Sequence, residues 1–117
     1  MIFPEIFLQI SKIKGVDGYI FMDNQGNIAA QDIKDSQKVS GMVFACGQNI
    51  YAIGKGQFKY AIFSRKNKRD IIIFPVGNYF LGVVKQKKTE TLVLVDIILK
   101  FLQEHFSKKV IYKREDP

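Results

Sequence analysis

The sequence has little of the chemistry that disulfides and metal sites need. Its 117 residues include one cysteine, Cys46, which excludes a disulfide within the chain, and nothing calls for an oxidising compartment. The one histidine, His105, has no cluster of cysteines or carboxylates beside it, whereas a zinc site takes about three or four protein ligands. We therefore expect no metal and no cofactor.

Groups for catalysis are also scarce. Cys46 falls among the apolar positions of an expected helix, which favours a buried thiol, whereas reactive thiols need exposure and a basic neighbour. Residues 54–56 (Gly-Lys-Gly) lack the serine or threonine of a phosphate-binding loop and follow a helix instead of a strand. Residues 23–26 are too short for a calcium loop. We therefore predict that the chain is not an enzyme.

Long apolar segments are missing as well. Residues 92–99 form the longest apolar run, which Asp96 interrupts and which is far too short to cross a bilayer. Residues 1–8 contain Pro4 and Glu5 and lack the basic flank and long apolar core of a signal peptide. The expectation is a soluble cytoplasmic protein.

The excess positive charge lies in the second half of the chain. Residues 1–54 hold four lysines against five Asp/Glu, a net −1, and residues 55–117 hold fourteen Lys/Arg against six Asp/Glu, a net +8, giving the total of +7. Such asymmetry attracts anionic partners but does not determine the fold.

Apolar spacing and turn residues predict eight elements. Apolar residues at three- and four-residue spacing indicate helices, and short apolar runs between Gly, Asn or charged turns indicate strands. In chain order we expect a helix over 3–14, strands over 19–23 and 27–31, a helix over 36–53, strands over 57–64, 70–76 and 79–85, and a helix from Thr89 or Thr91 to Phe106. The chain is then a single domain over 1–117, with a core over about 3–106 and a basic tail over 107–117.

The order α-β-β-α-β-β-β-α predicts the fold class. Strands this close in sequence pair antiparallel, and helices can cover both faces of one sheet. Residues 71–74 are apolar at every position, so this strand should be covered on both faces. We therefore predict an α/β (α+β) fold with a five-stranded antiparallel sheet and helices on both faces, of the profilin-like kind.

The expected helix over 36–53 carries more apolar surface than one core face uses. On a wheel at 100° per residue, Phe44 and Tyr51 share a line about 130° from the centre of the main apolar stripe. They either pack at the edge of the same core or face another subunit, as exposed aromatic surface often does. Gly41 and Gly47 each cost a helix roughly 1 kcal/mol and favour the second interpretation through close approach of another group. The main stripe consists of Val39, Met42, Val43, Cys46, Ile50 and Ile53.

The expected strand over 57–64 adds aromatic surface on both of its faces. Phe58 and Tyr60 point one way and Phe63 the other. If this is an edge strand it needs protection, and pairing with its own copy across a two-fold axis would provide that.

Two stretches of the sequence resemble a known family. Residues 15–18 (Gly-Val-Asp-Gly) followed by Tyr19–Gly26 are similar to the opening of Roadblock-type dynein light chain domains. Residues 59–64, 70–77 and 79–84 resemble that family's three-strand meander. The resemblance covers most of the chain, from about Phe3 to Phe106.

The resemblance implies a homodimer built by the second helix and third strand, with a continuous ten-stranded sheet. Members of the family serve as platforms for small Ras-like GTPases, as bacterial GTPase-activating partners in polarity systems, or as scaffold subunits in eukaryotic complexes. Here the strong basic charge and the Cys46-Gly47 pair depart from the family's usual pattern and leave the branch open. Carried over residue by residue, the dimer and partner interface would include Phe44, Gln48, Tyr51, Phe58 and Tyr60.

A second candidate surface is a basic patch at one end of the sheet. In an up-down-up meander, the charged turn over 65–69 lies at the same end as the residues that follow the last strand. This candidate anion-binding patch comprises Arg65, Lys66, Lys68, Arg69, Lys85, Lys87 and Lys88. It would attract phosphate, an acidic protein or anionic lipid. The alternative is a solvated hairpin tip that keeps the protein soluble, and Asp70 and Glu90 dilute the charge.

The leading hypothesis is therefore a homodimeric adaptor that binds a small Ras-like GTPase. Binding of nucleic acid or another anionic surface, including a membrane, through the basic end is an alternative, although no RNA or DNA motif is present. A small-ligand sensor is a third hypothesis, which the scarcity of polar groups on the expected strands disfavours.

Overall fold

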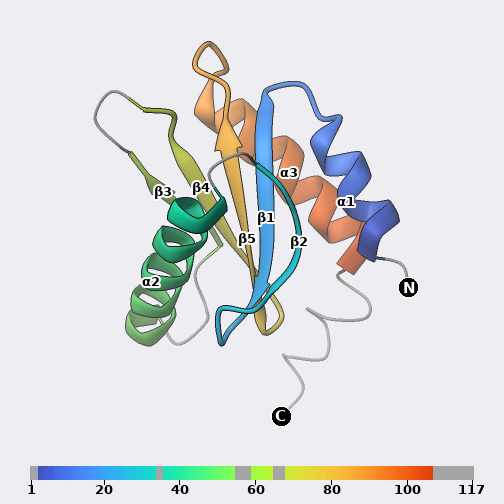
Figure 1. Cartoon of the computed structure of the whole chain (residues 1–117). Coiled ribbons are helices and arrows are strands. Elements are labelled where there is room, and N and C mark those ends of the chain that lie inside the picture. Colours follow the sequence, from blue (N-terminus) through green and yellow to red (C-terminus); the bar gives the residue numbers. More distant parts are fainter. Residues whose placement is uncertain (1–2, 34–35, 55–58, 65–67, 107–117) are drawn as a thin grey trace.

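The computed structural model describes residues 3–33, 36–54, 59–64 and 68–106 (Figure 1). All eight expected elements are present, in the expected order. They are α1 (Phe3–Ser11), β1 (Val16–Asp23), β2 (Ile28–Asp32), α2 (Ser36–Gly54), β3 (Ala61–Phe63), β4 (Ile71–Val76), β5 (Tyr79–Lys85) and α3 (Thr91–Phe106). Among the described residues no helix is long and apolar enough to cross a membrane.

The strands form one five-stranded sheet in the order β2-β1-β5-β4-β3, and all neighbouring strands are antiparallel. Figure 1 shows α2 on one face of this sheet and α1 with α3 on the other. The predicted fold class is therefore confirmed. The sheet ends at β2 on one side and at β3 on the other, so β3 is an edge strand.

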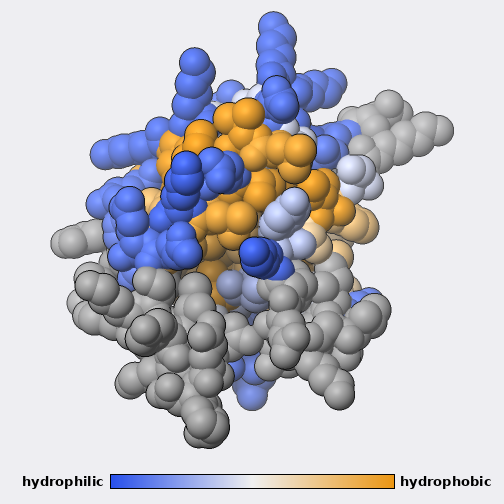
Figure 2. All heavy atoms as spheres, turned by 180° about the vertical axis from the view of Figure 1, so that it is seen from behind, coloured by the Kyte–Doolittle hydropathy of each residue, from blue (hydrophilic) through white to orange (hydrophobic). Residues whose placement is uncertain are grey.

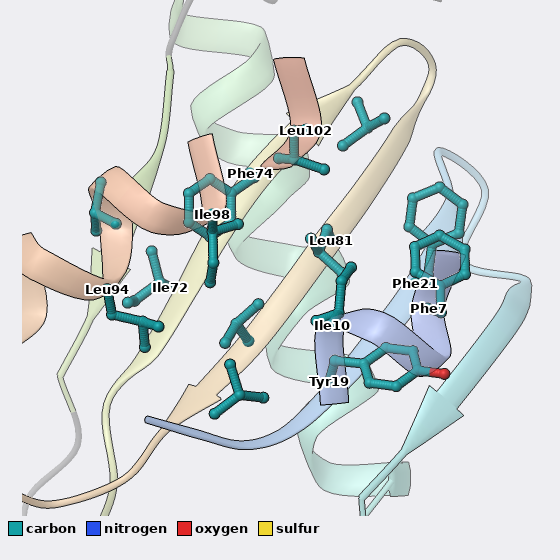
Figure 3. Close-up of a cluster of buried hydrophobic side chains, with 14 residues drawn as sticks. Phe7, Ile10, Tyr19, Phe21, Ile72, Phe74, Leu81, Leu94, Ile98 and Leu102 are labelled. Atoms are coloured by element: carbon teal, nitrogen blue, oxygen red, sulfur yellow. The ribbon is translucent and has the colours of Figure 1, made fainter. Parts of the chain in front are cut away.

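The core consists of two layers because the central strands are apolar on both faces. Adjacent residues of β4 show this, since the side chains of Ile72 and Ile73 are fully buried but belong to different layers. The layer under α1 and α3 is rich in aromatic rings (Figure 3), among them Phe7, Tyr19 and Phe21. The layer under α2 is mostly aliphatic. Its buried members are Ile20, Met22, Val39, Val43, Ile71, Ile73, Phe80 and Val84.

The turn between β1 and β2 is held by one carboxylate. Oδ1 of Asp23 accepts hydrogen bonds of 2.9 Å from the backbone N–H groups of Gln25 and Asn27. These bonds, together with one from the Asn27 side chain, stabilise the charged form and lower the pKa of Asp23. Gly26 has φ +92°, a backbone conformation that residues with a side chain rarely adopt.

The element boundaries differ from the prediction mainly next to turns. The first helix ends at Ser11, before the expected Lys14, because the N–H groups of Lys12 and Ile13 bond to carbonyls three residues earlier and form a tight turn. Gly15, with φ +101°, then directs the chain into β1. Pro75 is the penultimate residue of β4, as its missing N–H requires. The strand expected over 57–64 is described as a strand only over Ala61–Phe63, and residues 55–58 lie outside the described part of the chain.

Candidate interaction surfaces

Two of the predicted interface residues on α2 contact the β1–β2 turn of their own chain. Phe44 is half-buried against the aliphatic layer, and a Cβ added to Gly26 would lie 3.3 Å from its ring. The side-chain amide of Gln48 donates a hydrogen bond to the carbonyl oxygen of Asn24. Within one chain, Phe44 therefore packs at the edge of the core, as the first of the two interpretations holds, and is only partly buried.

The other three predicted interface residues are placed to different extents. Tyr60 lies just before β3, half-buried against the aromatic layer, with its ring centroid 6.4 Å from that of Phe74. Phe58 lies outside the described residues, and for Tyr51 the structure gives the position in α2 but no description of the side chain. The described interface residues therefore lie on α2 (Phe44 and Gln48) or next to β3 (Tyr60). Each of them has a contact within its own chain.

The two glycines of α2 have different surroundings. A Cβ added at Gly47 would lie 2.9 Å from the ring of Phe80, so the close approach there is to the chain's own sheet. A Cβ added at Gly41 would meet nothing within 4 Å. Gly41 and Ala45 are exposed and lie one turn apart on the side of α2 away from the sheet. Together with the exposed part of Phe44 they form what we call the open α2 face.

The two edges of the sheet also differ. The pairing of β1 with β2 shifts register between Phe21 and Met22, and β2 ends in the exposed Asp32. Bulges and charged residues both hinder the addition of a further strand. No charged residue or proline lies within β3, and its Ile62 is 42% exposed. Among the described strands, β3 is the edge better suited to pairing.

The structure corrects the predicted anion-binding patch at Lys85. The side chain of Lys85 is only 7% exposed, and its Nζ donates hydrogen bonds to the carbonyl oxygens of Gln86 (3.2 Å) and Thr89 (2.8 Å). These carbonyls accept hydrogen bonds from the ammonium group within the loop that follows β5. Lys85 therefore holds this loop in place, and its side chain is too buried to contact a ligand directly.

The structure describes only some of the remaining residues of the predicted patch. Nε of Arg69 lies 3.3 Å from a carboxylate oxygen of Asp17, so this cation is ion-paired. Lys68, Lys87 and Lys88 are exposed, whereas Arg65 and Lys66 lie outside the described residues.

Sequence reasoning missed two lysines at this end of the sheet. Lys12 and Lys14 are exposed in the connection between α1 and β1. The backbone N–H of Gln86 donates a 2.8 Å hydrogen bond to the carbonyl oxygen of Gly15, which fixes this connection beside the loop after β5. The signal that could have found them is the strand order, because pairing of β1 with β5 places the start of one beside the end of the other.

Cys46 and His105 have different surroundings. Burial raises the pKa of the Cys46 thiol, which lies at the edge of the aliphatic layer. Nδ1 of His105 lies 2.9 Å from the carbonyl oxygen of Phe101, on whose ring the imidazole packs. Within the described ranges, no group of three or more His, Cys, Asp or Glu side chains could hold a metal ion.

No protein-family model and no curated protein sequence matches this chain. Solved structures do. MglB of Myxococcus xanthus has 20% identity and a TM-score of 0.64, over 96% of this chain and 98% of that one. A Roadblock/LC7 domain from Streptomyces avermitilis has 10% identity and a TM-score of 0.60, over 81% of this chain and 86% of that one.

The profilin-like class is matched as well. LokiProfilin1 in its complex with rabbit actin has 13% identity and a TM-score of 0.60, over 90% of this chain and 94% of that chain. Identities this low establish the fold and nothing finer. This chain has the Roadblock/LC7 fold. Its resemblance to Roadblock domains, first seen in the sequence, is thus confirmed at the level of structure.

Proposed function

We propose that two copies of this chain pair through α2 and β3, and that the dimer is an adaptor for a small Ras-like GTPase. The observation that supports the dimer is the open α2 face, where Gly41 and Ala45 are exposed and no atom would lie within 4 Å of a Cβ added at Gly41. Small residues allow a second helix to approach closely, and the exposed part of Phe44 adds apolar area at the rim.

The edge strand supports the same pairing. A second β3 added to the unprotected edge would satisfy its outward backbone groups and extend the sheet across a two-fold axis. Because β3 and α2 belong to one side of the molecule in Figure 1, both contacts fit one interface.

The GTPase partner rests on the Roadblock resemblance. An adaptor of this kind acts by holding the switch loops of its partner in one arrangement, so it needs a complementary shape and no catalytic groups of its own.

Calorimetric titration tests the GTPase proposal. The full chain is titrated with any small Ras-like GTPase that is encoded beside its gene, loaded with GDP or with a non-hydrolysable GTP analogue. We expect binding that prefers one nucleotide state and is lost in Ala45→Arg, which alters the open α2 face. Ala29→Arg, an equal change at an exposed position of β2, serves as the matched control and should bind normally. Absence of binding in both nucleotide states would overturn the proposal.

A further inference from the structure

The first turn of α3 exposes two large aliphatic side chains. Leu92 is 62% exposed and Val93 51%, and they directly follow the loop that carries Lys87 and Lys88. Figure 2, which views the molecule from the side opposite α2, shows a continuous hydrophobic area bordered by hydrophilic groups. Exposed aliphatic residues next to lysines form a surface with both apolar and cationic character.

Two loops combine their charges at this surface. The hydrogen bond from Gln86 to Gly15 and the packing of Thr89 against Gly15 hold the loop after β5 to the connection after α1. Lys12 and Lys14 are exposed in the connection after α1. This contact therefore places them close to Lys87 and Lys88 in the loop after β5. We call these four lysines, with Leu92 and Val93, the lysine–leucine surface.

Two of the carboxylates around this surface are paired. Asp17 is bound to Arg69, and Asp96 lies 3.2 Å from Nζ of Lys100 one turn further along α3. Glu90 is exposed between the lysines and Leu92, and Asp70 is half-buried at the same end of the sheet. The four lysines exceed these two carboxylates and leave a net positive charge beside the aliphatic residues.

We propose that the lysine–leucine surface binds the surface of an anionic phospholipid bilayer. The lysines contact the negatively charged headgroups, and Leu92 and Val93 enter the boundary between headgroups and acyl chains. A bilayer satisfies both features at once, because it offers negative charge at its surface and apolar volume directly below.

Other occupants fit the composition less well. Protein interfaces are depleted in lysine and enriched in aromatic residues at their centres, whereas this surface has four lysines and no aromatic member. A second copy across a two-fold axis would bring lysines against lysines. Nucleic acid would use the lysines but leave Leu92 and Val93 without a role, since single-stranded nucleic acid is bound by aromatic stacking.

This inference does not rest on the GTPase proposal. The lysine–leucine surface lies on the α1 and α3 side of the sheet, and the open α2 face lies on the other (Figure 1). A chain bound to a bilayer through α3 therefore keeps the open α2 face available.

Co-sedimentation of the full chain with lipid vesicles tests the proposal. One set of vesicles is phosphatidylcholine alone, and the other is an equal mixture of phosphatidylcholine and phosphatidylserine. We expect binding to the mixed vesicles only, with an affinity that falls as salt is added. Lys87→Ser with Lys88→Ser should weaken it about 25-fold, since each lysine near an anionic surface contributes about fivefold. Leu92→Ser with Val93→Ser should weaken it at least about tenfold.

Matched variants separate this surface from general charge and hydrophobicity. Lys38→Ser with Lys59→Ser removes the same charge from exposed positions on α2 and before β3, and Ile28→Ser removes an exposed aliphatic side chain from β2. Both should bind the mixed vesicles as the native chain does. Thermal unfolding of each variant checks that the fold is retained.

Four results would overturn the proposal. They are no binding to the mixed vesicles, equal weakening by the control variants, binding that the Leu92 and Val93 substitutions leave unchanged, and stronger binding to single-stranded RNA than to the mixed vesicles, which would identify a nucleic-acid surface instead.

Discussion

The two faces of the sheet are closed in different ways. Under α1 and α3, Phe21 is 1% exposed, with its ring centroid 4.3 Å from that of Phe7 and 4.8 Å from that of Tyr79. Under α2 the buried side chains are mainly aliphatic, and Phe44 and Phe63 lie half-buried at the rim. Half-buried aromatic residues also lie at the rim of the first layer, namely Tyr60, Tyr79 and Phe101. The difference is therefore that two helices cover the first face, whereas a single helix with an exposed Gly41 and Ala45 covers the second. The second face is the one through which we propose that the chain pairs.

Truncating one phenylalanine on each face should give the largest contrast. Phe21→Ala removes a fully packed ring and should lower the free energy of unfolding by about 3–5 kcal/mol. Phe44→Ala removes a half-buried ring and should cost clearly less in the single chain. Chemical denaturation measures both losses. Equal losses at low protein concentration would show that α2 closes its face as fully as α1 and α3 close theirs.

The same substitution at two glycines of α2 should have different effects. At a protein concentration low enough to keep the chains apart, Gly41→Ala adds a methyl group in free space and should stabilise the helix by roughly 0.5–1 kcal/mol. Gly47→Ala gains the same helix propensity but forces the buried Phe80 ring to move, which costs about 1–3 kcal/mol. Since the propensity gain is shared, the difference in unfolding free energy between the two variants isolates the contact with Phe80.

Identical stability of the two glycine variants would contradict the placement of α2 on β5. A loss of stability in Gly41→Ala that grows with protein concentration is the result expected if the open α2 face pairs with a second copy. Each result sharpens the contrast between the covered and open sides of α2.

The turn that supports α2 should show a small pH-dependent effect. Asp23 has a pKa below its ordinary value of 3.8 when folded, so the folded state binds fewer protons than the unfolded state. Its stabilisation is therefore complete above that ordinary value and is lost as the pH falls through the lowered folded pKa. Asp23→Asn should lower the melting temperature slightly near neutral pH, and the difference from the native chain should shrink in acid. A difference that persists unchanged into acid would assign the effect to lost geometry alone.

The sequence predicted the elements well where a turn has a strong local signal. The strand over Tyr79–Lys85 was predicted with the observed bounds, because Gly77 and Asn78 mark its start. The first helix was predicted too long because apolar spacing continues to Ile13, which the structure places in a turn packed against the core. Periodicity records which side chains are apolar but not where the backbone changes direction.

The candidate surfaces were harder to predict because they depend on contacts between distant segments. A helical wheel gives the direction of Phe44 but not the β1–β2 turn that packs against it. The charge of Lys85 suggested an exposed cation, whereas its side chain is buried and its Nζ donates hydrogen bonds to two carbonyls of the loop. Lys12 and Lys14 join the basic end only through the pairing of β1 with β5. Such placements require the topology as well as the sequence.

The central claim, that the open α2 face binds a second copy, is tested most directly by the molar mass in solution. Light scattering coupled to size exclusion is applied to the native chain, to Ala45→Arg on α2 and to Ala29→Arg on β2, both exposed positions. We predict a dimer for the native chain and for Ala29→Arg, and a folded monomer for Ala45→Arg. A monomeric native chain, or a dimer that survives Ala45→Arg, would contradict the claim.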